Sequence, residues 1–254
     1  MEPLLKVNNL TRIFTRAGQP DFTAVNHISF DLYPGECLGL IGESGSGKTT
    51  VVNMITRLVD ASMGRIVLDG EDITNAKGSE LRKVYRKMQM VFQTPTESFD
   101  PRRTLGDGVG ESLRNSGMSR EETKREAAKL LKDCGLTPEF AARYPYQVSG
   151  GQCQRAAIAR ALAIKPKLLI CDEATSALDV TIQQEILALL NELRSRHGAG
   201  LSILFICHDI ALVQQFCDRV LFMYKGDIVE QGRPDDVIRN PQNEYTKRLI
   251  DSIL

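Results

Sequence analysis

The sequence predicts an α/β protein whose core is a mostly parallel sheet with helices crossing between the strands. Two short apolar runs of strand length, at 167–171 and 202–206, flank a longer stretch with helical periodicity. A glycine-rich segment directly follows a third apolar run at 36–41. Strand, helix and strand in this order are typical of parallel sheets with crossover helices.

The composition is that of an ordinary globular chain. Its 254 residues are 42% hydrophobic and 25% charged, with 32 Lys and Arg against 32 Asp and Glu, which excludes intrinsic disorder. The net charge of zero gives no whole-molecule field that would attract nucleic acid or an anionic membrane. No run approaches the roughly 18 apolar residues of a spanning helix, and the first residues lack a signal-peptide pattern. We therefore expect a cytoplasmic chain that can still sit on an integral membrane partner.

The first third of the chain is predicted to consist mainly of strands. Ile28, Phe30 and Leu32 alternate with polar residues, as expected for a strand with one buried face. Pro34-Gly35 then supplies a turn. Three further elements follow: a strand at 36–41, a helix from Thr49 to about Leu58, and a strand over Gly64–Leu68.

The middle third changes from strand to helix. Ser119 and Glu122 have the spacing of a capping box, in which each side chain accepts a hydrogen bond from the other's backbone N–H. Apolar residues follow at helical spacing until Gly135 ends the helix, namely Ala127, Leu130, Leu131 and Cys134. We therefore predict a helical subdomain at 94–165, inserted in a single domain that spans 1–254.

The last third alternates between strand and helix again. Between the two apolar strands, a helix ended by Gly198 buries a stripe that contains Ile182, Ile186, Leu189, Leu190 and Leu193. Val220–Tyr224 and Ile228–Glu230 are predicted to form a hairpin around Lys225-Gly226. The six cysteines have no C-x-x-C spacing, and we expect them to be small buried hydrophobic residues.

A phosphate-binding loop is the strongest functional signal in the sequence. Residues 42–49 match G-x-x-x-x-G-K-[ST] between a predicted strand and a predicted helix. Glycines let backbone N–H groups converge on phosphate oxygens, Lys48 supplies positive charge, and the Thr49 hydroxyl suits Mg²⁺. The loop is therefore predicted to bind a nucleoside triphosphate through Gly42, Ser44, Gly45, Ser46, Gly47, Lys48, Thr49 and Thr50.

Two further strand ends carry side chains suited to phosphate chemistry. Asp172 follows the strand at 167–171 and can hold Mg²⁺, and the adjacent Glu173 can accept a proton from an attacking water. His208 follows the strand at 202–206 and can donate a hydrogen bond to the γ-phosphate. Because ligands of open α/β sheets bind beyond the carboxyl ends of the strands, we expect these groups beside the phosphate loop.

A second glycine-rich segment, Ser149-Gly150-Gly151-Gln152, stands at the start of a predicted helix and can bind an anion there. The loop at 42–49 already provides the phosphate site of one nucleotide, so this second anion site is surplus to it. In this order the motifs resemble those of the nucleotide-binding subunit of an ATP-binding cassette (ABC) transporter, from Leu5 to about Leu249. The resemblance implies a P-loop ABC-type ATPase fold with an N-terminal antiparallel β subdomain and a helical insert. It also implies ATP hydrolysis, with ATP and Mg²⁺ as the cofactors.

The resemblance assigns a role to each motif. Glu173 and His208 are catalytic, and Gln93 is the Q-loop glutamine that contacts Mg²⁺ or water. The metal ligands are then Thr49, Gln93 and Asp172. Ser176-Ala177-Leu178-Asp179 resembles the D-loop, and its Asp179 is implied to contact nucleotide. Ser149, Gly150, Gly151 and Gln152 match the signature motif and are implied to contact nucleotide as well.

Some positions leave alternatives open or depart from the family pattern. Phe14 is implied as the aromatic residue that stacks on adenine, with Phe22 as the other candidate. Val148 replaces the usual leucine before the signature motif, and Ala174 replaces the common proline after the catalytic glutamate. Neither change removes a catalytic group.

The resemblance also implies an assembly. In this family two ATPase subunits enclose two ATP molecules head to tail, each signature helix lying over the other subunit's nucleotide. The partners implied are a second ATPase subunit, two integral membrane permease subunits contacted near Gln93, and indirectly an extracytoplasmic solute-binding protein, with no nucleic acid. The chain would lie on the cytoplasmic face of the inner membrane.

Three segments resemble the ATPases of peptide and nickel importers, which typically pair two different ATPase subunits, although a homodimer stays open. They are Ser98–Arg102, Arg143–Pro145 and Asn240–Thr246. The expected cargo is an oligopeptide, a dipeptide or a nickel or other metal chelate. One alternative is an importer of another substrate class. The other is an ABC-type ATPase without a transport function: a DNA-repair ATPase would need coiled-coil arms, and a translation-associated one would need a second cassette.

Overall fold

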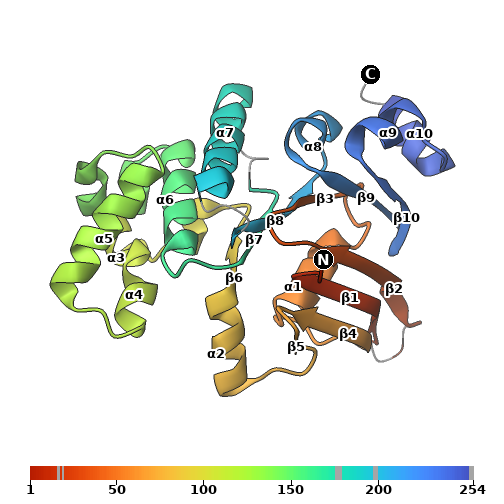
Figure 1. Ribbon diagram of the computed structural model, residues 1–254, viewed down its shortest axis with the longest axis horizontal. Coiled ribbons are helices and arrows are strands. Elements are labelled where there is room, and N and C mark those ends of the chain that lie inside the picture. Colours follow the sequence, from red (N-terminus) through yellow and green to blue (C-terminus); the bar gives the residue numbers. More distant parts are fainter. Residues whose placement is uncertain (16–17, 19, 175–178, 197–199, 252–254) are drawn as a thin grey trace.

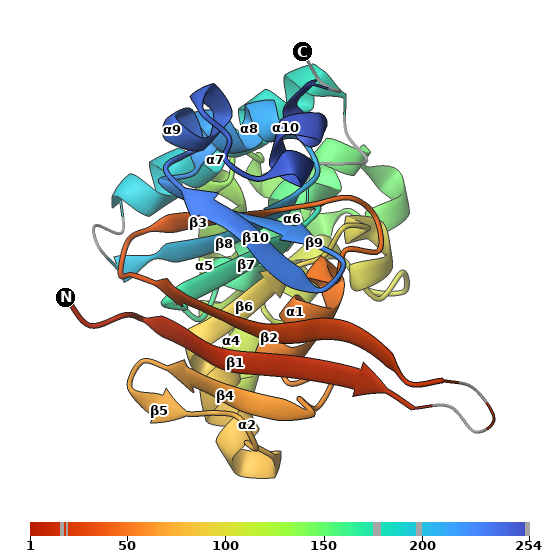
Figure 2. The same cartoon turned by 90° about the vertical axis from the view of Figure 1, so that its right-hand side faces the viewer.

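The computed structural model describes residues 1–251 except 16–17, 19, 175–178 and 197–199. An antiparallel sheet and a larger core sheet occupy one side of the molecule, and a block of helices lies at the opposite end (Figure 1). The view turned by 90° shows the long N-terminal strands running beneath the core sheet (Figure 2).

The smaller sheet pairs its strands antiparallel in the order β2-β1-β4-β5. Ile28, Phe30 and Leu32 are all buried, which confirms the alternation predicted for this segment. The four strands are β1 (Leu5–Phe14), β2 (Phe22–Leu32), β4 (Met63–Leu68) and β5 (Glu71–Asp72).

The core sheet has the order β10-β9-β3-β8-β7-β6 and is parallel except for the β9–β10 pair. It confirms the predicted parallel core, and the antiparallel pair confirms the hairpin around Lys225-Gly226. Its strands are β3 (Cys37–Ile41), β6 (Met88–Val91), β7 (Leu168–Asp172), β8 (Ser202–Cys207), β9 (Arg219–Tyr224) and β10 (Asp227–Gly232).

In the part of the chain that the structure describes, α-helices and short 3₁₀ segments fill the intervals between strands. The α-helices are α1 (Lys48–Ile55), α2 (Gly78–Lys87), α3 (Leu105–Val109), α4 (Glu111–Asn115), α5 (Arg120–Asp133), α6 (Gly150–Leu162), α7 (Val180–Arg196), α8 (Ile210–Phe216), α9 (Pro234–Arg239) and α10 (Glu244–Asp251). The 3₁₀ segments are η1 (Pro95–Ser98), η2 (Pro138–Ala142) and η3 (Pro145–Gln147).

Residues 94–165, all of them described, form only helices and turns. Helix α5 begins with the predicted capping box, because the Ser119 hydroxyl accepts from the Glu122 N–H and the Glu122 carboxylate accepts from the Ser119 N–H. The block at the left of Figure 1 is therefore consistent with a helical subdomain inserted between β6 and β7.

The core sheet is buried on both faces, which explains its continuous apolar strands. Alternate residues of each parallel strand enter two separate apolar clusters, as Leu169 and Leu168 do in β7. Gly39 in β3 allows α8 to approach closely, because a Cβ there would lie 2.8 Å from Val213 Cγ1. All six cysteines are buried and free, as expected for small hydrophobic residues.

One helix differs from its predicted length. The helix after the phosphate loop ends at Ile55 instead of near Leu58. The reason lies in the backbone, since Arg57 adopts a positive φ of 61°, which an α-helix does not permit. The predicted end of α7 at Gly198 lies outside the described residues. Within the described part of the chain, none of the helices combines the length and the apolar character that crossing a membrane requires.

Candidate active site

The loop between β3 and α1 has the backbone of a phosphate cradle. Gly45 and Gly47 adopt φ values of 79° and 111°, which residues with a Cβ rarely reach. Gly47 caps the N-terminus of α1 without a side chain. The first amides of α1 therefore face the loop unobstructed, where the helix dipole favours an anion.

Two glycines of the loop are also fixed by neighbouring backbone. A Cβ on Gly42 would lie 2.3 Å from the Met223 carbonyl oxygen of β9. A Cβ on Gly47 would lie 2.5 Å from the Ala24 carbonyl oxygen of β2. The loop is therefore held between the two sheets, and its glycines are required by packing as well as by φ.

Lys48 is held inside the loop although it is charged. Its side chain is almost fully buried, and its Nζ donates to the carbonyl oxygens of Gly42 at 2.6 Å and Glu43 at 2.9 Å. Burial lowers the pKa of Lys48, while the carboxylates of Glu173 and Asp172 oppose the shift. The two hydrogen bonds thus keep the ammonium group beside the cradle.

The two predicted carboxylates lie at the carboxyl end of β7. Asp172 pairs in register with Ile206 of β8, and the next N–H, of Glu173, donates to the Ile206 carbonyl oxygen at 3.1 Å. Burial raises the pKa of Asp172, the Glu173 carboxylate adds to the shift, and Lys48 acts in the opposite direction. The site therefore holds a partly buried carboxylate close to a buried ammonium group.

Glu173 has an unusual backbone and a side-chain partner from the loop that follows β6. Its φ is 47°, a value that costs free energy in a residue other than glycine and that recurs at functional sites. The Gln93 Nε2 donates to Glu173 Oε2 at 2.9 Å. The structure therefore brings the predicted Q-loop glutamine and the predicted catalytic carboxylate together across 80 residues of sequence.

A cleft of about 260 Å³ opens over the phosphate loop. Glu173 lines the cleft, and so do Phe22 and Ala24 from β2. Phe14 is not among the lining residues, and instead the Arg12 guanidinium lies over its ring at 4.5 Å. The remaining lining residues belong to the loop and the start of α1, namely Ser44, Gly45, Gly47, Lys48, Thr49 and Thr50.

The donor set fits a magnesium triphosphate. The buried Ser46 Oγ has no hydrogen-bond partner among the described residues, so the cradle retains an unused polar group. Thr49, Gln93 and Asp172 offer the hydroxyl, amide and carboxylate oxygens that Mg²⁺ prefers. These residues would hold the metal, and the amides of the loop would hold the phosphates.

The second glycine-rich helix start belongs to the helical block. Ser149 caps α6 in a capping box with Gln152, and the N–H of each residue donates to the side chain of the other. Gly151 packs on α7, where a Cβ would lie 2.7 Å from Ile182 Cγ2. Helix α6 lies in the half of the molecule opposite α1, so this anion site is separate from the phosphate loop (Figure 1).

The other predicted site residues are placed as follows. His208 is exposed just beyond the end of β8, the strand that pairs with β7 and β3. Asp179 caps α7, since its Oδ1 accepts from the Ile182 N–H at 3.0 Å. Ser176, Ala177 and Leu178 of the predicted D-loop lie outside the described residues.

The comparisons with known proteins identify the family of this chain. The sequence pattern of the ABC transporter family matches residues 25–176, which is more than half of the chain. The chain therefore belongs to the ABC transporter family and contains an ABC-type ATPase domain.

Two curated relatives are similar over almost the whole chain. The glutathione import ATP-binding proteins GsiA of Escherichia coli (strain K12) and Pectobacterium atrosepticum are each 45% identical over 259 residues, covering 99% of this chain and 41% of the relative. The chain thus spans about two-fifths of the length of the curated relatives it matches.

Solved structures with the same fold include two ATP-binding cassettes. The dimeric MJ0796 cassette in a post-hydrolysis state with ADP and Pi is 31% identical, with a TM-score of 0.82 and coverage of 91% of this chain and 98% of that one. CbiO1 from Clostridium perfringens, part of the ABC transporter complex cbiONQ, is 27% identical, with a TM-score of 0.83 and coverage of 100% and 96%.

Sequence reasoning missed several groups that shape the site. The Met223 and Ala24 carbonyl groups confine the loop, and a backbone carbonyl has no signature in sequence. Tyr245 also reaches the loop, with its hydroxyl 3.0 Å from the Glu43 nitrogen. Its segment was recognised only as a subfamily feature, and no local pattern indicated where the side chain would point.

Asp172→Asn is expected to raise the melting temperature of the nucleotide-free protein, because the amide has nearly the same shape as the carboxylate and carries no charge that burial would make unfavourable. The raised pKa of Asp172 means that its ionised form costs stability at neutral pH. This cost disappears as the pH falls below the pKa of Asp172 in the folded protein and approaches about 3.9, the ordinary pKa of an Asp side chain.

Thermal unfolding at pH 7 and near pH 4 checks this prediction. The gain should be present at pH 7 and should shrink in acid. Asp21→Asn, at an exposed position, is the matched control and should change little. An unchanged or lower melting temperature for D172N at pH 7 would contradict the proposed cost of the buried carboxylate.

Phe22→Ala is expected to weaken ATP binding by roughly 5- to 150-fold, the range that loss of base–aromatic stacking worth about 1–3 kcal/mol produces. The reason is that Phe22, 62% exposed, lines the cleft over the phosphate loop. Isothermal titration of the nucleotide-free protein with ATP measures the change. Phe14→Ala is the matched comparison, and a larger loss for F14A than for F22A would return the stacking role to Phe14.

Proposed function

We propose that this chain is the ATP-binding and ATP-hydrolysing subunit of an ABC importer, and that it powers uptake through a separate membrane permease. The observation that carries the proposal is the convergence of Lys48, Gln93 and Glu173 at one end of the core sheet. A non-catalytic binding module would not need the carboxylate and glutamine beside its phosphate cradle.

The residues divide the chemistry among themselves. Lys48 and the amides of the loop bind the β- and γ-phosphates, and Thr49, Asp172 and Gln93 hold Mg²⁺, which neutralises phosphate charge when it is bound. Glu173 accepts a proton from the attacking water, and its hydrogen bond from Gln93 orients the carboxylate. His208 donates to the γ-phosphate from the end of β8.

A second ATPase subunit completes each site in this proposal. The exposed start of α6, at Ser149 and Gly150, lies in a different half of the chain from α1. It would cap the γ-phosphate bound by the other subunit, with Gly151, Gln152 and Asp179 beside it. The similarity to a dimeric cassette supports this arrangement.

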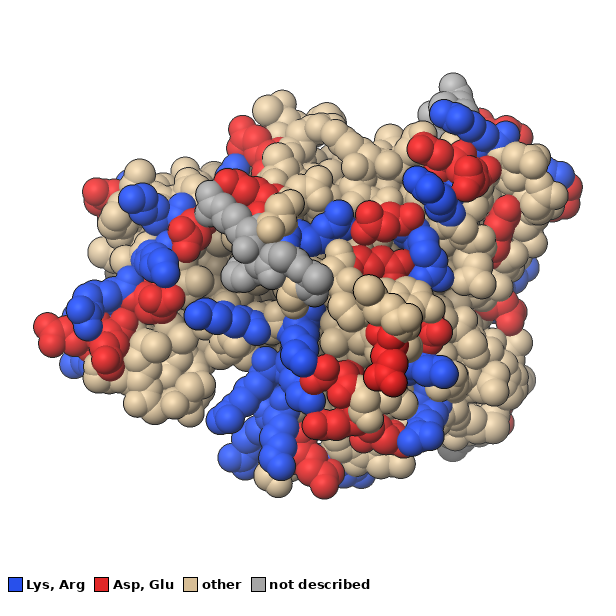
Figure 3. All heavy atoms as spheres, viewed as in Figure 1, with Lys and Arg blue, Asp and Glu red and all other residues tan. Residues whose placement is uncertain are grey.

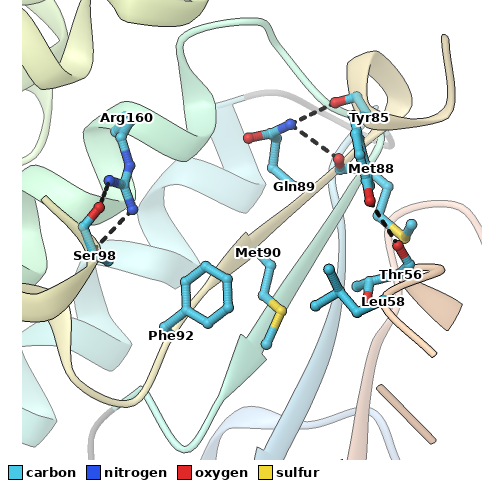
Figure 4. Close-up of a pocket in the computed structure, with 9 residues that line it drawn as sticks. All are labelled: Thr56, Leu58, Tyr85, Met88, Gln89, Met90, Phe92, Ser98 and Arg160. Carbon is cyan, nitrogen blue, oxygen red and sulfur yellow. Dashed lines mark hydrogen bonds between the residues drawn. The ribbon is translucent and has the colours of Figure 1, made fainter. Parts of the chain in front are cut away.

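The permease would dock in a groove of about 450 Å³ beside Gln93. Leu58 and Phe92 are 59% and 43% exposed there, and such apolar exposure is typical of interaction surfaces. In Figure 4, Phe92 and Met90 lie near the middle of the view, with Arg160 at the left and Tyr85 at the right. The remaining lining residues are Thr56, Met88, Gln89 and Ser98.

A cationic surface borders this groove. Figure 3 shows Lys and Arg side chains gathered in one patch over α2, the helix that carries Tyr85. Its exposed cations are Lys77, Arg82, Lys83 and Arg86. This surface would face the permease and the inner membrane, which agrees with a peripheral position on the cytoplasmic side.

The proposed cargo is a peptide-like solute. Similarity to the glutathione import protein GsiA and to the peptide and nickel importer segments supports oligopeptides or dipeptides first, and nickel or metal chelates second. By the same similarity the second ATPase subunit would be a different chain, and an extracytoplasmic solute-binding protein would deliver the cargo. No nucleic acid is part of this function.

Glu173→Gln is expected to keep ATP binding and to lower ATP turnover by roughly 100-fold or more, because an amide cannot accept the proton of water. The variant should also accumulate a closed dimer with ATP, seen by size-exclusion chromatography with light scattering. Lys48→Ala is the control and should lose both binding and dimer formation. Turnover of E173Q near the wild-type rate would overturn the role of Glu173.

Purification of the tagged chain with its membrane partners tests the transport function. After reconstitution in vesicles with the copurified binding protein, dipeptides or glutathione should stimulate ATP hydrolysis several-fold. Stimulation by a nickel chelate in place of peptides would assign the second cargo class. Absence of any permease in the purified complex would contradict the importer proposal.

A further inference from the structure

The C-terminal helix reaches back to the phosphate loop. Tyr245, at the start of α10, is only 4% exposed, and its hydroxyl accepts a hydrogen bond from the Glu43 N–H at 3.0 Å. The two residues are 202 positions apart in the sequence. Both views place α10 beside the β9–β10 hairpin, at the edge of the core sheet (Figures 1 and 2).

The peptide group that Tyr245 contacts is the one that holds Lys48. The Glu43 N–H and the Gly42 carbonyl belong to a single planar peptide unit. The carbonyl side accepts from Lys48 Nζ at 2.6 Å, while the N–H side donates to Tyr245. A rotation of this peptide would therefore break both hydrogen bonds at once, so the tyrosine hydroxyl fixes the direction of the carbonyl.

Tyr245 is itself held firmly. Its ring stacks on Tyr224 of β9, with the ring centres 4.2 Å apart and an angle of 26° between the planes. Its N–H donates to Asn243 Oδ1 at 2.8 Å, which caps the start of α10. Burial raises the pKa of the Tyr245 hydroxyl, so this group stays neutral at physiological pH.

The segment before α10 is anchored to β10 by one carboxylate. The Glu230 oxygens accept from the N–H groups of Gln242 at 2.8 Å and Asn243 at 3.1 Å. These contacts fix the chain immediately before the tyrosine. The Asn240–Thr246 segment is therefore a brace between the hairpin and the phosphate loop.

We infer that Tyr245 is a positioning residue for ATP: its hydroxyl keeps the Gly42–Glu43 peptide in the orientation that holds Lys48 at the phosphate site. The inference rests on the proposed ATP-binding function of the loop. It assigns to the C-terminal segment a role in nucleotide affinity, because the brace acts on the cradle and touches none of the reacting atoms.

Tyr245→Phe is the direct test, since it removes the hydroxyl and retains the stacked ring. The KM and Kd for ATP should rise roughly 3- to 10-fold, the range set by loss of one net hydrogen bond. The kcat should stay within twofold of wild type. Hydrogen exchange of the segment 40–47 should also become faster in the nucleotide-free variant, because the Glu43 N–H loses its acceptor.

Tyr224→Phe is the matched control. It removes a hydroxyl from the other ring of the same stack, and that hydroxyl makes no hydrogen bond with the described residues. Y224F should therefore keep the wild-type KM, kcat and hydrogen exchange. A change of the same size in Y224F would show that the stack, and not the hydroxyl, supports the loop.

Several outcomes would overturn the inference. One is an unchanged KM in Y245F, and another is a fall in kcat by the same factor as the rise in KM. The third is a raised KM without faster hydrogen exchange at 40–47. Melting temperatures of both variants show whether the fold is intact. Lys48→Ala, measured in parallel, separates the two proposals: if K48A binds ATP as tightly as wild type, the proposed function fails, whatever Y245F does.

Discussion

The parallel pairing of β3, β8 and β7 is the constraint on which the rest of the site depends. Ile41 is in register with Cys207, and Asp172 with Ile206, so the three strands end level with one another. The phosphate loop follows β3 directly, His208 follows β8, and Asp172 and Glu173 are the last residue of β7 and the one after it. Their proximity is therefore a property of the sheet.

Positively and negatively charged side chains lie close together at this edge of the core sheet. The buried Lys48 ammonium donates to two loop carbonyl groups, and the nearby carboxylates of Glu173 and Asp172 oppose the lowering of its pKa by burial. Lys48 in turn opposes the rise that burial causes in the pKa of Asp172. Each charged group would be unfavourable alone in such surroundings. Together they hold positive and negative charge side by side at one edge of the core sheet.

The cradle is a local motif that depends on distant backbone. Its glycines meet the Met223 and Ala24 carbonyl groups, and one of its peptides is held by a tyrosine from the last helix. The N-terminal sheet, the β9–β10 hairpin and α10 thus converge on eight residues of loop. This explains why a loop of glycine and serine can hold one conformation in spite of its high chain entropy.

The sequence by itself determined the fold class, the capping box of α5, the parallel strands and the identity of the phosphate loop. Each of these follows from short-range patterns, since periodicity, caps and glycine spacing act within a few residues. The placement of Gln93 against Glu173 was anticipated only through the family resemblance, because 80 residues separate the two.

Only the tertiary structure decided which aromatic residue lines the cleft, where α1 ends and what braces the loop. Phe14 and Phe22 are paired neighbours in one hairpin, and local sequence could not tell which ring would face the cleft. The end of α1 depends on a single positive φ at Arg57, and the Tyr245 contact spans almost the whole chain. Such features arise from packing between elements, and the chain reveals them only once the sheets have formed.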